Sequence, residues 1–140
     1  MRIVLDTNVL VSALLNPHGA PGAVLQLIYS GEVVVFFDDR ILSEYRDVLG
    51  RPKLRISRRE AEFTVDFIEA EGVRVSAPPL DLDLVDPDDL PFLEIAQASH
   101  VDGLVTGNTR HFVGTPVAEA VPVLTPTEFL ALWRSRQREH

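Results

Sequence analysis

The sequence predicts an α/β fold in which a mostly parallel sheet of about five strands is covered by helices on both faces. Two observations support this prediction. Short apolar runs of strand length alternate along the chain with longer segments whose apolar residues recur at helical spacing. Strands that alternate with helices are joined by crossover connections, which place neighbouring strands in parallel. With 140 residues, 46% of them hydrophobic, the chain is expected to form a single domain over residues 1–140.

Two buried strands and four helices are expected in the first half of the chain. The strands are the uninterrupted apolar runs 3–5 and 33–37, a pattern typical of strands buried on both faces. A loop rich in glycine and proline, 16–22, separates the first two helices. Ser57 begins the fourth helix, and Glu60 follows three residues later, as in a capping box. The expected helical segments are 9–15, 23–28, 41–49 and 58–71, with stops at Gly31, Pro52 and Gly72.

The second half of the chain adds three strands and two helices. The acidic segment 81–89 is expected to be irregular, because aspartate and leucine alternate in it and it contains proline. Pro91 fits the first turn of a helix, where its missing N–H would have no partner, and Asp88 or Asp89 would be the N-cap. The expected strands are 73–75, 103–106 and 121–124, and Thr125 caps a last helix over 126–136.

The net charge of −8 argues against a large nucleic-acid interface, because phosphate binding depends on a local density of cations. The charges are nevertheless separated along the chain. Five basic residues lie within 51–59, whereas five aspartates lie within 81–89. This distribution fits a cation site beside a modest surface for a polyanion, and it fits a solvated charged surface nearly as well.

The chain is expected to be cytoplasmic and to have no membrane partner. Cysteine is absent, which excludes disulfides and thiolate chemistry and suits a reducing compartment. The N-terminal apolar run contains Asp6 and Asn8 and lacks a basic leader of any length, so it is a poor signal peptide. No other run approaches the length of a membrane span.

Polar side chains follow the ends of the buried strands. Asp6 follows the first strand, Asp38 and Asp39 follow the second, and Asn108 follows the strand at 103–106. In a parallel sheet these ends face the same side, where open α/β sheets bind their ligands. Glu44, one to two turns into the helix after the second strand, can lean toward the same rim. Asp38 and Asp39 are expected to be helix caps.

Three further aspartates, Asp86, Asp88 and Asp89, precede the helix that leads into the strand at 103–106. Connectivity alone does not place them at the rim, so the acidic loop would have to carry them back. Carboxylates that converge repel each other unless a cation compensates. Oxygen ligands favour Mg²⁺ or Mn²⁺, which suit phosphoryl chemistry, whereas zinc is disfavoured because the four histidines lack ligand spacing. The alternative is that Asp6 and the later aspartates only cap helices.

Four motifs follow one another along the chain in a recognisable order and spacing. They are Asp6-Thr7-Asn8, Ser43-Glu44, Asp86-Pro87-Asp88-Asp89 ahead of Phe92-Leu93-Glu94-Ile95-Ala96, and Val105-Thr106-Gly107-Asn108 with His111-Phe112. Together they closely resemble the PIN domain family. Within that family the chain is similar to the VapC-like ribonucleases, the toxins of toxin–antitoxin pairs. The resemblance implies a Rossmann-like three-layer α/β/α fold and a metal-dependent ribonuclease with three or four acids holding Mg²⁺ or Mn²⁺.

The resemblance also assigns roles to individual positions. Asp6, Glu44 and Asp89 match the first three acids of the family and would be the metal-binding and catalytic residues. Asp86 and Asp88 are nearby substitutes. Asn108 stands where many relatives have the fourth acid; an amide can ligate through its oxygen but adds no charge, which favours one ion over two. Asn8 and Thr106 match two positions of the family whose side chains usually form hydrogen bonds that hold the acids in place.

The expectations also include binding partners and two alternative functions. The resemblance implies an RNA substrate, a cognate antitoxin and a homodimer, for which the apolar residues of the helices after 20 and 57 are available. One rival is a non-catalytic PIN module that binds RNA or protein. Another is a phosphatase with an aspartyl nucleophile, disfavoured because Asn8 stands where that class needs a second aspartate and Lys53 is the only lysine. His111 is expected to be a structural loop residue rather than a contact to substrate.

Overall fold

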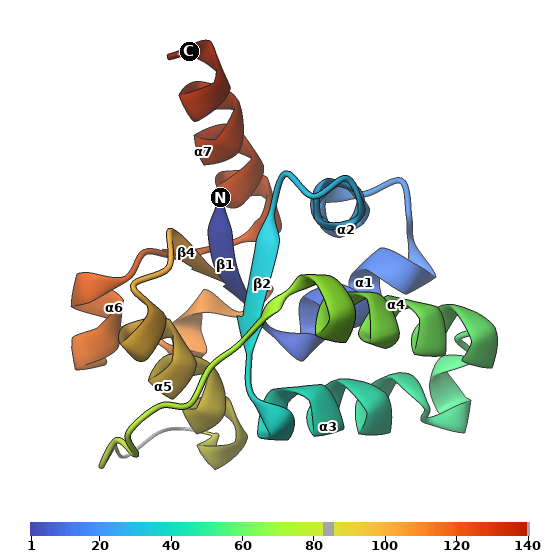
Figure 1. Cartoon of the computed structure of the whole chain (residues 1–140), viewed down its shortest axis with the longest axis horizontal. Coiled ribbons are helices and arrows are strands. Elements are labelled where there is room, and N and C mark those ends of the chain that lie inside the picture. The colour runs from blue at the N-terminus through green and yellow to red at the C-terminus, as the bar shows by residue number, and fades with distance from the viewer. Residues whose placement is uncertain (83–85, 140) are drawn as a thin grey trace.

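The computed structural model, which describes residues 1–82 and 86–139, has a parallel sheet between two layers of helices (Figure 1). The predicted α/β fold is confirmed. Within the described ranges the strands are β1 (Arg2–Leu5), β2 (Val34–Phe37), β3 (Val73–Arg74), β4 (Gly103–Val105) and β5 (Val123–Leu124). The helices there are α1 (Thr7–Leu15), α2 (Ala20–Tyr29), α3 (Asp39–Leu49), α4 (Arg58–Glu71), α5 (Leu90–Ser99), α6 (Pro116–Ala120) and α7 (Pro126–Arg138), with short 3-10 turns η1 (Pro52–Leu54), η2 (Pro87–Asp89) and η3 (Thr109–His111).

Strand β1 lies at the centre of the sheet, whose order is β3-β2-β1-β4-β5 with all neighbours parallel. Ile3 lies opposite Val35 in β2 and opposite Gly103 in β4. Because β1 has a neighbour on each edge and helices on each face, Ile3, Val4 and Leu5 are completely buried. The chain adds strands first on one side of β1 and then on the other, so the carboxyl end of β1 is a topological switch point.

The helices divide between the two faces of the sheet. In Figure 1 helices α1, α2 and α4 lie on one side of the sheet, and α5 and α6 lie on the other. Helix α5 contacts β1, β2 and β4, whereas α7 contacts α2, β4 and β5. The carboxyl ends of β1 and β2 point toward the lower part of the view, where α3 and α5 lie. These elements therefore surround the end of β1.

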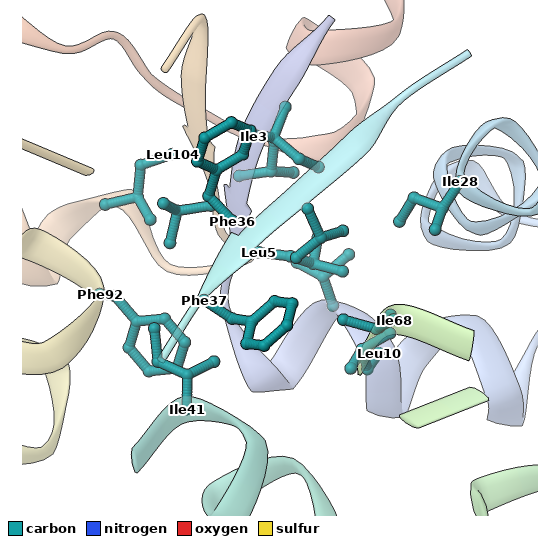
Figure 2. Close-up of a cluster of buried hydrophobic side chains, with 14 of the residues drawn as sticks. Ile3, Leu5, Leu10, Ile28, Phe36, Phe37, Ile41, Ile68, Phe92 and Leu104 are labelled. Carbon is teal, nitrogen blue, oxygen red and sulfur yellow. The ribbon is translucent and has the colours of Figure 1, made fainter. Parts of the chain in front are cut away.

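The core joins the strands to the helices of both layers. Side chains from β1, β2 and β4 meet side chains from α1, α3, α4 and α5 in one buried cluster (Figure 2). Phe37, Phe92 and Ile41 at the start of α3 are all buried members of this cluster. The rim of the sheet that carries the polar residues thus rests on packed aromatic and aliphatic side chains.

Two local predictions were wrong near proline. The loop expected over 16–22 is shorter, because α2 begins at Ala20 and Pro21 occupies its first turn. Helix α6 was not predicted at all. Its start follows the same rule: Pro116 is the first helical residue and Thr115 accepts a hydrogen bond from the N–H of Ala118. A proline that breaks one element can therefore begin the next.

Several expected element ends agree with the structure. Helix α4 ends at Gly72, where a Cβ would lie only 2.5 Å from the carbonyl oxygen of Val35, so that only glycine lets the chain approach β2 so closely. Ser57 caps α4, accepting the N–H of Glu60 at 3.3 Å. Thr125 caps α7 in a complete capping box with Glu128.

The acidic segment expected to be irregular can be followed only in part, because residues 83–85 of it lie outside the described residues. Asp81 is exposed and non-helical, whereas η2 adds a turn at Pro87–Asp89 that was not predicted. In the two described ranges, no helix combines the length and the apolar character that a membrane crossing requires.

A buried hydroxyl joins α3 to the end of β1. Tyr45 is completely buried, and its hydroxyl donates to the carbonyl oxygen of Leu5 at 2.5 Å. Burial raises the pKa of Tyr45 well above its usual value, and the negative charges of Asp6 and Glu44 raise it further, so the phenol stays neutral and donates. The bond fixes the backbone one residue before Asp6.

Replacing Tyr45 with phenylalanine should lower the free energy of unfolding by about 1–3 kcal/mol, because the carbonyl of Leu5 loses a buried donor. Urea unfolding of both proteins measures the difference. Tyr29→Phe is the matched control, since the Tyr29 hydroxyl contacts Thr64 in a less buried setting and its loss should cost less. Equal losses in the two variants would contradict a special role for the Tyr45 bond.

Candidate functional site

Asp6 follows β1 directly and lies at the switch point of the sheet. It occupies the N-cap position of α1, but its carboxylate accepts the hydroxyl of Thr106 at 2.7 Å instead of capping the helix. Only 7% of Asp6 is exposed. Burial raises the pKa of Asp6, although the Thr106 hydrogen bond and the nearby N–H groups of Thr7 and Asn8 lower it in part.

Glu44 reaches the same rim from α3. Its carboxylate accepts a hydrogen bond from the hydroxyl of Thr7, in the first turn of α1. Burial raises the pKa of Glu44, and the negative charges of Asp6, Asp88 and Asp89 raise it further. Sequence reasoning missed Thr7 as a partner, and its place between Asp6 and Asn8 in the first motif is the one signal that could have indicated it.

The acidic loop does return to the rim, as the sequence analysis required. Asp89 is 7% exposed, and its pKa is raised to about 6 by burial and by the charges of Asp6 and Asp86, against the lowering effect of His111. Three side chains each offer one possible ligand atom, and these atoms lie within 4.8 Å of one another: they belong to Asp86, Asp89 and His111. Asp88 is exposed at this edge, close enough to raise the pKa of Glu44.

The expected N-cap of α5 is confirmed in position, although its side chain does not cap the helix. Asp89 occupies the N-cap position of α5, but its side chain makes no capping hydrogen bond. Asp86 instead accepts the N–H of Asp88 at 3.0 Å and closes the turn η2. Because Asp86 performs the local capping, the carboxylate of Asp89 is available to face Asp6.

Asn108, His111 and Asp89 form a chain of hydrogen bonds across the rim. Nδ2 of Asn108 lies 2.8 Å from Nε2 of His111, and Nδ1 of His111 lies 3.0 Å from Oδ2 of Asp89. A neutral imidazole protonated at Nδ1 satisfies both contacts, because it accepts from the amide and donates to the carboxylate. The backbone N–H of Asn108 donates to the hydroxyl of Thr106 at 3.0 Å.

The two expected supporting residues act differently. The Thr106 hydroxyl bonds directly to Asp6, as described above. The side-chain oxygen of Asn8 instead accepts the backbone N–H of Gly107 at 3.1 Å. Asn8 therefore joins the start of α1 to the loop after β4, and its bond goes to the backbone rather than to a carboxylate.

An ion pair between the half-exposed Arg40 and the buried Glu94, beside the rim, was not predicted. Glu94 is only 2% exposed; it accepts Nη1 of Arg40 at 2.7 Å and the backbone N–H of Leu80 at 2.6 Å. Arg40 also contacts Asp38 at 2.7 Å, while Asp38 caps α3 through the N–H of Ile41, as expected. The one sequence signal for this anchor is a glutamate inside the apolar run of α5.

The rim can hold a hard divalent cation. Asp6, Glu44 and Asp89 come from three different parts of the chain, and each carboxyl has a raised pKa because it is removed from water; for Glu44 and Asp89 nearby negative charges raise the pKa further. A divalent cation with oxygen ligands would relieve this repulsion and keep all three groups ionised at neutral pH. The donor set therefore fits the ion class that the sequence analysis favoured.

Comparison with known proteins gives one partial relative. An uncharacterized protein of Methanocaldococcus jannaschii is 44% identical over 55 residues, which is 39% of this chain. The matched segment covers 36% of the length of that relative.

A solved structure shares the fold over nearly the whole chain. The crystal structure of VapBC2 from Rickettsia felis bound to a DNA fragment from their promoter contains a chain similar to this one, with a TM-score of 0.58 and 17% sequence identity. The match covers 89% of this chain and 98% of that chain. At this identity the likeness establishes the fold, and it confirms the three-layer arrangement that the sequence predicted.

A sequence model of the PIN domain family matches residues 2–110. The match extends from β1 into the turn η3, and it includes all the acids of the rim together with Asn108. The chain therefore belongs to the PIN domain family.

Proposed function

We propose that this protein is a metal-dependent ribonuclease that hydrolyses RNA phosphodiesters as the toxin of a type II toxin–antitoxin pair. One observation carries the proposal. Asp6, Glu44 and Asp89 lie near one another at the carboxyl end of β1; burial raises the pKa of each, and acidic neighbours raise the pKa of Glu44 and of Asp89 further. Metal-dependent nucleases use such a concentration of oxygen ligands to hold a divalent ion.

Asp6, Glu44 and Asp89 would hold Mg²⁺ or Mn²⁺, with Asp86 and Asp88 beside them. A bound ion of this class supplies an activated water at neutral pH and neutralises charge on the leaving oxygen. Thr106 and Thr7 are the positioning residues of this proposal. The Thr106 hydroxyl restrains Asp6 and the Thr7 hydroxyl restrains Glu44, so that both carboxylates keep their orientation before substrate arrives.

A second candidate function is a catalytically weak PIN module that acts by binding RNA or protein. The observation that favours it is Asn108, which adds no charge and whose amide is engaged by His111. Calorimetric titration with Mn²⁺ separates the two functions: a ribonuclease must bind the ion, whereas a binding module need not.

Contact with RNA would require a positively charged surface. The basic segment 51–59 has less free positive charge than its composition suggests, because some of its arginines pair with carboxylates. Arg51 pairs with Asp47, and Arg58 pairs with Glu62, each across one turn of helix or its continuation. These pairs favour a solvated connection between α3 and α4 over a dedicated clamp for the RNA backbone.

Protein partners belong to the same proposal. The resemblance implies a cognate antitoxin and a homodimer, and the structurally similar chain comes from a VapBC2 complex with DNA. On this protein, Tyr29 of α2 and Phe63 and Phe67 of α4 form an aromatic cluster, and Phe63 is 60% exposed. This cluster supports a protein-contact surface on α2 and α4.

Replacing Asp6 with asparagine or alanine should abolish cleavage of single-stranded RNA in Mg²⁺ or Mn²⁺. We expect the loss to exceed the roughly 10- to 100-fold that removal of an outer-shell partner costs a metal site. Initial cleavage rates measure the effect, with Asp81→Asn as a control that removes an exposed charge outside the rim. Cleavage that survives either Asp6 variant, or survives EDTA, would refute the assignment.

The contribution of Asp89 to the stability of the metal-free protein should fall as the pH rises from about 4 to 6, because the pKa of Asp89 is raised from 3.8 to about 6. Between these values the folded state binds more protons than the unfolded state, so ionisation favours unfolding. Asp89→Asn should therefore stabilise the metal-free protein at pH 7.5 by up to about 3 kcal/mol and change little below pH 4.

Urea unfolding in EDTA at pH 4 and pH 7.5 measures this effect, and Asp81→Asn again serves as the control. Saturating Mn²⁺ should reverse the order, stabilising the wild type more than Asp89→Asn, because the ion binds the folded state. A wild-type stability that does not fall relative to Asp89→Asn over this pH range would contradict the electrostatic account of the rim.

A further inference from the structure

We infer that Nδ1 of His111 is a direct ligand of the metal ion at this rim, and that the site therefore prefers a first-row transition ion such as Mn²⁺ to Mg²⁺. The inference rests on the proposed metal-binding function and specifies its ligand set. It departs from the all-oxygen set that the acids alone would provide, because an imidazole nitrogen takes one position.

The positions of the ligand atoms carry the inference. Asp86, Asp89 and His111 each present one ligand atom, and these three atoms lie within 4.8 Å of one another. Nδ1 of His111 is 3.0 Å from Oδ2 of Asp89. Two neighbouring ligands about 2.1 Å from an octahedral ion lie about 3.0 Å apart, so an ion can bind both groups with little change in their separation.

Asn108 provides the outer support that such a histidine needs. A metal-bound histidine usually holds its other ring nitrogen in a hydrogen bond that fixes the tautomer and the ring orientation. The side-chain amide of Asn108 lies 2.8 Å from Nε2 of His111, which is the ring nitrogen on the far side from Asp89. Asn108 is therefore a positioning residue for His111 rather than a ligand.

An amide suits this position in both states of the site. Without an ion, Nδ1 carries the hydrogen and donates to Asp89, and the NH₂ group of Asn108 donates to Nε2. With an ion on Nδ1, the hydrogen moves to Nε2, and the amide turns over so that its oxygen accepts. A carboxylate can only accept, so it would match the ion-bound state alone. This gives a physical role to the residue that replaces the fourth acid of the family.

The ligand type sets the expected metal preference. Mg²⁺ takes oxygen ligands and keeps several waters, whereas an imidazole nitrogen is a softer donor that favours first-row transition ions. His111 is partly buried, with 33% of its side chain exposed, and Asp89 beside it is more buried. The nitrogen is therefore held at the edge of the acid cluster, where an ion can reach it.

The test is the electron spin echo of Mn²⁺ bound to the full chain, in which a ligating imidazole gives a ¹⁴N modulation. We expect the modulation in the wild type and its loss in His111→Gln. His18→Gln is the matched control, since His18 is exposed in the loop before α2, and it should keep the signal. Calorimetry should show Mn²⁺ affinity at least tenfold weaker in His111→Gln and Mg²⁺ affinity less affected.

Two substitutions of Asn108 test its positioning role. Asn108→Asp can still accept from Nε2 and should retain the ¹⁴N modulation and most of the Mn²⁺ affinity. Asn108→Leu cannot bond to the ring, and the affinity should fall about tenfold or more. Equal affinities in these two variants would overturn the positioning role.

The outcomes separate the inference from the function on which it rests. Mn²⁺ that binds the wild type without a ¹⁴N modulation, or a modulation that persists in His111→Gln, overturns the ligand assignment and leaves the proposed nuclease intact. A wild-type protein that binds no Mn²⁺ overturns both.

Discussion

The burial of β1 between two parallel neighbours is the constraint on which the rest of the structure depends. A strand paired on both edges and covered on both faces must be apolar until it ends, and here it ends at Asp6. The carboxylate therefore leaves the core where the sheet reverses its direction of growth. Tyr45 fixes the preceding carbonyl, and Thr106 at the end of β4 holds the carboxylate itself. These two hydrogen bonds therefore connect the polar rim to the strands of the sheet.

The acids of the rim are placed at an energetic cost to the metal-free fold. Each carboxyl is removed from water, which raises its pKa, and the charges of neighbouring carboxylates raise the pKa of Glu44 and of Asp89 further. Hydroxyl donors from Thr7 and Thr106 offset part of this cost, and His111 offsets part of it for Asp89. Such an arrangement is typical of a functional site rather than of a stabilising surface, where opposite charges alternate.

The fold was largely predictable because its signals are local. Apolar runs bounded by polar residues predict the strands, and Gly72 and Thr125 mark the ends of α4 and the start of α7. Predictions failed where one residue type serves two purposes, as at Pro21 and Pro116, each of which begins a helix and also looks like a breaker.

The positions of the acids at the rim were partly predictable, but their contacts were not. Asp6 and Glu44 could be placed from the order of strands and helices. The partners of these acids depend on side chains that meet across the tertiary structure, as Thr7 meets Glu44 and His111 meets Asp89 over a separation of 22 residues. The spacing of apolar residues along the sequence does not indicate which side chains form such pairs. The anchor of Arg40 on Glu94 has the same origin, since only the packing of α3 beside α5 brings them together.

That anchor has an entropic consequence for the loop that carries Asp86 and Asp89. Glu94 holds the backbone of Leu80, and η2 begins at Pro87, so the chain is restrained only a few residues before it reaches the rim. A chain whose backbone is already held at Leu80 has fewer conformations to lose when the carboxylates of Asp86 and Asp89 are ordered around a ligand. The buried glutamate thus acts at a distance from those carboxylates, by lowering the conformational entropy that binding has to remove.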